Sequence, residues 1–146
     1  LAGFPTVDFR AVIYDGSYHS VDSSEIAFKL AAHLAFKAGI PEAGAVLLEP
    51  IMELVVTVPE EFTGAILGDL NTRRARVQGM EQVRGNGVVT ASVPLAEIQR
   101  YATDLRSMTQ GRGLYTIKLA GYDIVPSHLV EKIAAAAAEK RKSHEA

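Results

Sequence analysis

The sequence has no cysteine and no tryptophan among its 146 residues. The absence of cysteine excludes a disulfide-linked scaffold, a zinc site with thiolate ligands and a cysteine nucleophile. No apolar run approaches the roughly 18 residues that a membrane-spanning helix needs, and the first residues show no basic and apolar leader. The composition, 48% hydrophobic and 22% charged, is typical of a globular protein with one domain or two small ones.

The sequence also lacks the common motifs of catalysis. It contains no Gly-x-x-x-x-Gly-Lys-Ser/Thr phosphate loop, and no Gly-x-Gly-x-x-Gly opens a predicted helix. The four histidines are too far apart along the chain to show the spacing of metal ligands. We therefore expect no catalytic residue, metal site or cofactor site within this chain.

The formal net charge is only −2, but the charges are unevenly distributed. Residues 1–69 carry 3 basic and 10 acidic side chains, whereas residues 70–118 carry 8 basic and 3 acidic ones. The basic segment could neutralise a few phosphates of a nucleic acid. Composition alone favours the simpler interpretation, in which these charges solvate helix and strand surfaces.

Residues 1–48 predict one strand and one helix. Apolar residues alternate with others over residues 7–14, which indicates a strand, and Asp15–Ser17 follow as a turn. One strand and one helix in roughly 45 residues cannot close a core, and both edges of the strand would lack a partner. We interpret this part as half of a domain whose other strands precede Leu1 or come from another chain. Because Leu1 is not methionine, we also expect an excised or processed piece.

The helix is predicted to begin at Asp22, whose side chain can cap it while Glu25 reaches back in a capping box. Its apolar side is wide, which implies burial against more than one neighbour. Gly39 and Pro41 are expected to end it.

Residues 49–125 predict a complete domain. Two helices are expected after prolines, and four strands are expected at about residues 49–58, 74–83, 88–94 and 114–122. The segment Arg84–Gly87 has the composition of a hairpin turn, with positive φ expected at Asn86 and Gly87. The order β-α-β-β-α-β is that of the ferredoxin-like fold.

The chain ends in a predicted helix. Ser127 can cap this helix after Pro126, and from Glu139 onwards we expect a frayed, solvated tail. The predicted fold class is therefore α+β. It comprises an incomplete strand–helix half-domain, a ferredoxin-like domain, and a C-terminal helix with its tail, over residues 1–48, 49–125 and 126–146.

Basic side chains of the ferredoxin-like domain gather near its helices. Arg73, Arg74 and Arg76 lie where the first helix meets the second strand, and Arg74 and Arg76 would share one face of that strand. Such a pair is suitable for binding phosphates. Arg112 follows the second helix as a further candidate. We favour an RNA contact slightly for the cluster over residues 73–76.

Two other features favour structural roles. Arg100 lies three and four positions from Glu97 and Asp104, so simple ion pairing on the helix is favoured for it. The candidate inner strands carry Tyr115 and no phenylalanine, and the ribonucleoprotein signature is absent. Base stacking on the sheet, as in an RNA-recognition motif, is therefore not expected.

The loop over residues 15–22 places hydroxyl groups and an imidazole just before a helix. Its candidate side chains are Ser17, Tyr18, His19, Ser20 and Asp22. Periodicity alone favours a polar turn with a surface histidine. A Ser-His-Asp catalytic set is less favoured, because the three residues are crowded into one turn with no pattern of oxyanion donors.

Four segments can be compared with known families. They are YDGSYHSVDSSEIAF at residues 14–28, VLLEPIM at 46–52, GDLN at 68–71 and YATDLRSMTQGR at 101–112. In this order they strongly resemble bacterial translation elongation factor G, over nearly the whole chain. The resemblance implies the second half of the family's fourth domain, then its complete fifth domain and C-terminal helix.

The resemblance also implies a function. The family is a ribosomal translocase whose fourth domain enters the A site of the small subunit and displaces tRNA and mRNA after GTP hydrolysis. The residues that match the tip loop near the tRNA–mRNA duplex are His19 and its neighbours Ser17, Tyr18, Ser20 and Asp22. This chain would itself be no enzyme. Its parent would be a ribosome-dependent GTPase that holds GTP and Mg²⁺ in a domain absent here.

The fifth domain of this family lies against large-subunit rRNA near the proteins of the stalk base. By this resemblance the candidate rRNA contacts are Arg73, Arg74, Arg76 and Arg112. The implied partner is the ribosome, and we expect a monomeric, cytoplasmic protein without membrane contact.

Two alternatives remain open at this point. A paralogue in ribosome recycling or ribosomal protection would keep much of the same architecture. From another class, the chain could be a free-standing ferredoxin-like module that senses a ligand and dimerises through its strand edges.

Overall fold

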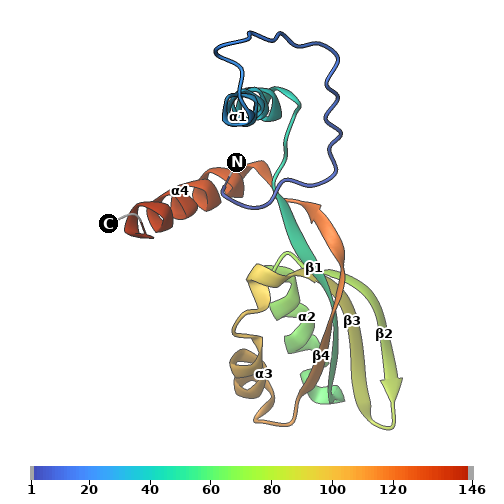
Figure 1. Ribbon diagram of the computed structural model, residues 1–146. Coiled ribbons are helices and arrows are strands. Elements are labelled where there is room, and N and C mark those ends of the chain that lie inside the picture. The colour runs from blue at the N-terminus through green and yellow to red at the C-terminus, as the bar shows by residue number, and fades with distance from the viewer. Residues whose placement is uncertain (1, 145–146) are drawn as a thin grey trace. The chain divides into compact units, whose positions relative to one another are not determined.

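The computed structural model describes residues 2–144, with side chains through residue 139. The described chain forms two units (Figure 1). We call the segment Leu48–Ile124 the sheet unit, and the segments before and after it the terminal unit. Helices and an antiparallel sheet occur together in the chain, and the predicted α+β fold class is confirmed. The final helix, predicted as a separate segment over residues 126–146, lies in the same unit as the N-terminal segment.

The sheet unit contains one antiparallel sheet. Its strands are β1 (Leu48–Pro59), β2 (Arg76–Val83), β3 (Asn86–Pro94) and β4 (Leu114–Ile124), in the spatial order β2-β3-β1-β4. All neighbouring strands are antiparallel. The predicted ferredoxin-like topology is confirmed. β1 and β3 are the central strands, and each helical connection passes one strand of the sheet: the β1–β2 connection passes β3, and the β3–β4 connection passes β1.

Helical segments cover one face of this sheet (Figure 1). They are the 3-10 helix η1 (Glu60–Phe62), α2 (Thr63–Thr72), the 3-10 helix η2 (Leu95–Ile98) and α3 (Tyr101–Thr109). The side chains between the two layers are almost fully buried: Leu54, Val56, Val58, Ile66, Leu70, Val89, Ala91, Val93, Ile98, Tyr101 and Leu105. Burial alternates along β1 and β3, as expected for strands that pack on one side only.

The register places Tyr115 on the helix-covered face. It lies opposite Val56, which belongs to the core, and its ring meets the Tyr101 ring edge to face at 5.3 Å. Such aromatic pairs stabilise a core beyond the area that they bury. Tyr115, the residue considered for base stacking, is therefore not available on the open face of the sheet.

Three local predictions for the sheet unit are wrong. The hairpin turn uses positive φ at Arg84 and Gly85, and Asn86 already pairs with Val83 in the ladder. The second strand begins at Arg76, because Arg74 has a positive φ of 55° that ends α2. The single helix expected after Pro94 is divided into η2 and α3.

The terminal unit contains α1 (Glu25–Glu42) and α4 (Ser127–His144). Its buried residues are Ala2, Leu47 and Val125, which pack with the inner side of α4. The strand predicted over residues 7–14 is absent, and these residues are exposed and irregular. A strand needs a hydrogen-bonded neighbour, and within the described residues this segment has none.

The last helix is longer than predicted. The tail was expected to fray from Glu139, but α4 continues beyond this residue to His144. The final two positions of the predicted tail, residues 145 and 146, lie outside the described residues.

The ends of α1 also differ from the prediction. Ser24, and not Asp22, is the N-cap, and its Oγ accepts a hydrogen bond from the Ala27 N–H at 3.1 Å. The helix passes Pro41 and is followed by Gly44 at φ 76°. A proline in the last turn removes only one hydrogen bond, so it does not force an earlier end. No residue of α1 is buried, and its apolar side chains remain exposed.

Gly87 marks a close approach of α2 to the sheet. A Cβ built on Gly87 would overlap Thr63 Oγ1 and would lie 3.3 Å from both Thr63 Cβ and Cγ2. Rotation of the threonine moves Oγ1 but leaves its Cβ in place, so a tight contact remains. We expect Gly87→Ala to lower the free energy of unfolding by about 1–3 kcal/mol, as overpacked cores do. Urea unfolding followed by circular dichroism measures this change.

Gly79 on β2 is the matched control, because nothing lies within 4 Å of a Cβ at that position. Gly79→Ala should leave stability nearly unchanged, and Thr63→Ala should restore part of the loss in Gly87→Ala. Equal effects of the two glycine substitutions would contradict the close approach.

Candidate nucleic-acid interface

Residues 19–23 form a compact turn immediately before α1. The His19 N–H donates to Ser23 Oγ at 2.7 Å, and the Ser23 N–H donates to the His19 carbonyl at 3.0 Å. His19 Nδ1 lies 3.3 Å from the Val21 nitrogen, 3.4 Å from the Asp22 nitrogen and 3.3 Å from Asp22 Oδ2. The turn therefore occupies Nδ1 and leaves the other ring nitrogen, Nε2, outside these contacts.

The structure brings the predicted loop residues together in one exposed segment. Ser17, Tyr18, His19, Ser20 and Asp22 are all exposed, with Tyr18 at 73%. Ser17 and His19 form no hydrogen bond with each other in the described part of the chain, so the geometry of a nucleophile and its base is not present. The loop offers hydroxyl, imidazole and carboxylate groups to a polar ligand.

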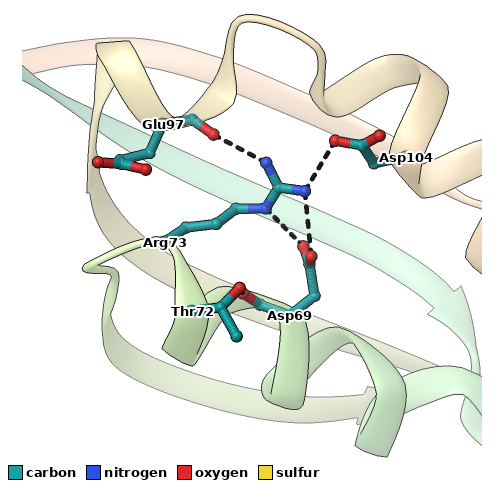
Figure 2. A network of polar contacts seen from close by, with 5 residues as sticks. All are labelled: Asp69, Thr72, Arg73, Glu97 and Asp104. Carbon is teal, nitrogen blue, oxygen red and sulfur yellow. Dashed lines mark hydrogen bonds and ion pairs between the residues drawn. The ribbon is translucent and has the colours of Figure 1, made fainter.

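The structure gives Arg73 internal partners for its whole guanidinium (Figure 2). Nε and Nη2 donate to the two oxygens of Asp69 at 2.7 and 3.0 Å, and Nη2 also donates to Asp104 Oδ2 at 2.8 Å. Nη1 donates to the Glu97 carbonyl at 2.8 Å, and the guanidinium lies 5.2 Å from the centre of the Tyr101 ring. Arg73 therefore joins α2, η2 and α3.

Arg74 joins the helical layer to β1. Nη1 and Nη2 donate to the two oxygens of Glu49 at 2.7 and 3.0 Å, and Nε donates to Glu97 Oε1 at 2.9 Å. Because Arg73 is the C-cap of α2, the left-handed Arg74 occupies the position where glycine is usual. The prediction that Arg74 shares a strand face with Arg76 is wrong, since Arg74 lies in the turn.

These contacts fix the charge state of the network. The pKa of Arg73 is raised, chiefly by its hydrogen bonds with Asp69, and that of Arg74 chiefly by those with Glu49. Burial raises the pKa of the Tyr101 hydroxyl to about 12, and the nearby Asp69 carboxylate adds to the effect. Both arginines thus stay cationic, and the Tyr101 hydroxyl stays neutral, at physiological pH.

Arg76 and Arg112 differ from this pair. Arg76 is exposed on the edge strand β2, and its register partner is Ser92 on β3. Arg112 is half exposed, forms an ion pair between Nη2 and Glu61 Oε1 at 2.9 Å and lies 4.7 Å from the centre of the Phe62 ring. Both side chains thus reach solvent, and the two residues lie at separate places in the sheet unit.

The acidic partners of these arginines were not predicted from the sequence. Asp69 stands four positions before Arg73, a spacing that indicates a helical ion pair, so a local signal was present. Glu49 lies 25 positions before Arg74, and no local pattern links them. The pairing expected between Arg100 and the acids Glu97 and Asp104 is wrong, because Arg74 and Arg73 take those carboxylates.

The described residues contain neither a metal-binding cluster nor a membrane-spanning helix. No group of three histidine, aspartate or glutamate side chains within residues 2–139 is arranged to hold a metal ion. None of the helices in that range combines the length and the apolar character needed to cross a bilayer.

Two substitutions of Arg74 separate the effect of its ion pairs from that of its left-handed backbone. Arg74→Ala keeps a side chain in the left-handed region and leaves the Glu49 carboxylate, which is 11% exposed, without its partner. We expect a loss of about 2 kcal/mol in the free energy of unfolding. Arg74→Gly loses the same ion pairs but removes the backbone strain, so it should be about 1 kcal/mol more stable than Arg74→Ala.

Urea unfolding of both variants measures the difference, with Arg76→Ala as the exposed control that should change stability by less than about 0.5 kcal/mol. Identical stability of the alanine and glycine variants would show that the left-handed backbone carries no strain.

Comparison with known proteins also divides the chain near residue 45. Residues 1–44 match the family described as Elongation factor G, domain IV, and residues 46–133 match Elongation factor G C-terminus. A crystal structure of a protein from Thermus thermophilus is similar, with 49% sequence identity and a TM-score of 0.73. The similarity covers 86% of this chain and 19% of that one, so this chain spans about a fifth of the length of its relative.

The two matches follow each other along the chain, and the second alone covers more than half of it. Together with the antiparallel β2-β3-β1-β4 sheet and the exposed loop before α1, they establish that the chain belongs to the elongation factor G family.

Proposed function

We propose that this chain is the ribosome-contacting C-terminal portion of a translational GTPase that promotes translocation of tRNA and mRNA. The observation that carries the proposal is the exposed loop around His19, whose polar groups lie in the part matched to domain IV of elongation factor G. An exposed loop with fixed polar groups is suited to contact with nucleic acid. The ribosome is the partner, with the tRNA–mRNA duplex of the A site at this loop.

The mechanism is steric and electrostatic. The loop acts as a wedge with positioned hydrogen-bonding groups, and no proton transfer is required of it. It promotes movement by contacting one ribosomal state better than another, because a ligand shifts an equilibrium only through such a difference. GTP and Mg²⁺ belong to a GTPase domain elsewhere in the parent protein, and the site of action is the cytoplasm, where ribosomes translate.

The C-terminal part contributes contacts with rRNA near the proteins of the stalk base. Arg76 and Arg112 are the arginines whose exposure suits this role. For Arg73 and Arg74, the rRNA contact stays a prediction that their internal ion pairs make less favourable. These two residues would affect RNA binding mainly by holding the sheet unit together.

Membership in the elongation factor G family favours this proposal over a free-standing ligand-sensing module. Recycling and ribosomal-protection paralogues share the architecture, and the measurement of translocation separates them from a translocase.

His19→Ala in the parent factor should slow single-turnover translocation while ribosome-dependent GTP hydrolysis continues at nearly the normal rate. The reason is that the loop contacts the moving RNA, whereas hydrolysis occurs in another domain. His33 on α1 is also an exposed histidine, and His33→Ala is the matched control. Equal loss of translocation and hydrolysis in His19→Ala would contradict the proposal.

Arg76→Ala should weaken binding of the parent factor to ribosomes and reduce the slope of log affinity against log salt by about 1. Arg73→Ala should lower the stability of the sheet unit and leave this slope unchanged. Filter binding across a salt series measures both. An unchanged slope in Arg76→Ala would contradict an RNA contact of Arg76. A reduced slope in Arg73→Ala would contradict the purely structural role of Arg73.

A further inference from the structure

We propose that Ser23 is a positioning residue that, together with the backbone N–H groups of Val21 and Asp22, fixes the His19 imidazole, so that its Nε2–H is the group offered to an RNA acceptor. This inference rests on the proposed function, since it names the atom of the loop that meets the RNA. It is carried by the contacts that converge on His19 from the three residues of the turn that follow Ser20.

The contacts of Nδ1 determine where the ring carries its proton. Two backbone N–H groups, those of Val21 and Asp22, point at Nδ1 from 3.3 and 3.4 Å. A neutral ring that accepts from them has its hydrogen on Nε2. A protonated ring has Asp22 Oδ2 as its ion-pair partner, 3.3 Å from Nδ1, and carries a hydrogen on both nitrogens. In both states Nε2 is a donor.

The remaining neutral form is disfavoured by the same geometry. A neutral ring with its hydrogen on Nδ1 would direct that hydrogen toward the amide hydrogens of Val21 and Asp22. It would also leave Nε2 as an acceptor. RNA offers acceptors on its phosphates and 2′-hydroxyls, so a donor is the useful group on the outer side of the ring.

Ser23 holds the backbone on which the ring stands. Its Oγ accepts from the His19 N–H at 2.7 Å, and its own N–H donates to the His19 carbonyl. Ser24 caps α1, so Asp22 and Ser23 are both available to His19 and neither is used by the helix end. A ring held in this way loses less conformational freedom when it binds a ligand.

The first test is spectroscopic and uses the parent factor labelled with ¹⁵N-histidine. His19 is assigned by comparison with His19→Gln, and its ring nitrogens should show an unprotonated Nδ1 and a protonated Nε2 in the neutral state. Ser23→Ala should convert this single form into a mixture of both tautomers, whereas Asp22→Ala keeps the backbone N–H groups that point at Nδ1 and should leave the form unchanged. Asp15→Asn is a second control, because the only hydrogen bond of the exposed Asp15 carboxylate among the described residues is the one that it accepts from the Gly16 N–H.

The second test compares two amides in single-turnover translocation. The glutamine amide nitrogen reaches the place of Nε2, whereas the asparagine amide nitrogen lies near the place of Nδ1. His19→Gln should therefore stay within about threefold of the unchanged factor, and His19→Asn should be slowed about tenfold, as is His19→Ala, which corresponds to one lost hydrogen bond.

The outcomes separate this inference from the proposed function. A neutral ring with its hydrogen on Nδ1, or an unchanged tautomer in Ser23→Ala, overturns the positioning role whatever happens to translocation. Better activity of His19→Asn than of His19→Gln overturns the choice of Nε2. Normal translocation in His19→Ala overturns the function of the loop while the spectroscopic result still stands.

Discussion

Two consecutive arginines at the end of α2 hold the sheet unit together. Arg73 binds the carboxylates of two helices and a carbonyl of a third segment, and Arg74 reaches across to β1. Hydrogen bonds between charged groups in such partly buried positions are stronger than their exposed counterparts. Apolar contacts between the helices and the sheet are non-directional. The hydrogen bonds of these ion pairs are directional, so they fix how the helices are placed over the strands. Removal of one member leaves its partner charged and poorly solvated.

The same contacts divide the basic residues into two groups. Arg73 and Arg74 neutralise partly buried acids of their own chain, whereas Arg76 is exposed and Arg112 is half exposed in its pair with the exposed Glu61. A count of charges along the sequence therefore overstates the surface that can attract phosphates. In the terminal unit the hydrogen bonds of the loop organise one exposed imidazole. The large apolar side chains of α1 are exposed in the same unit.

Periodicity in the sequence predicted the sheet unit well. Alternation along β1 and β3 identifies the buried face directly, and the turn glycines and prolines separate the elements. The prediction of a strand at residues 7–14 is wrong. Alternation shows that apolar side chains would share one face of a strand, but it does not show that a partner strand is present. The exposed loop was predicted, but its internal order was not: the ring contacts of His19 depend on how five residues turn. The pairing of Arg74 with Glu49 spans 25 positions, and only the folded sheet brings the two together.

The left-handed Arg74 has a consequence for the evolution of this fold. Glycine would remove the backbone strain at this position, but it would leave the carboxylates of Glu49 and Glu97 without their ion-pair partner. Drift from arginine to glycine therefore costs less stability when those two acids are replaced by neutral residues in the same lineage. The three positions are coupled through their ion pairs, although they are distant along the gene.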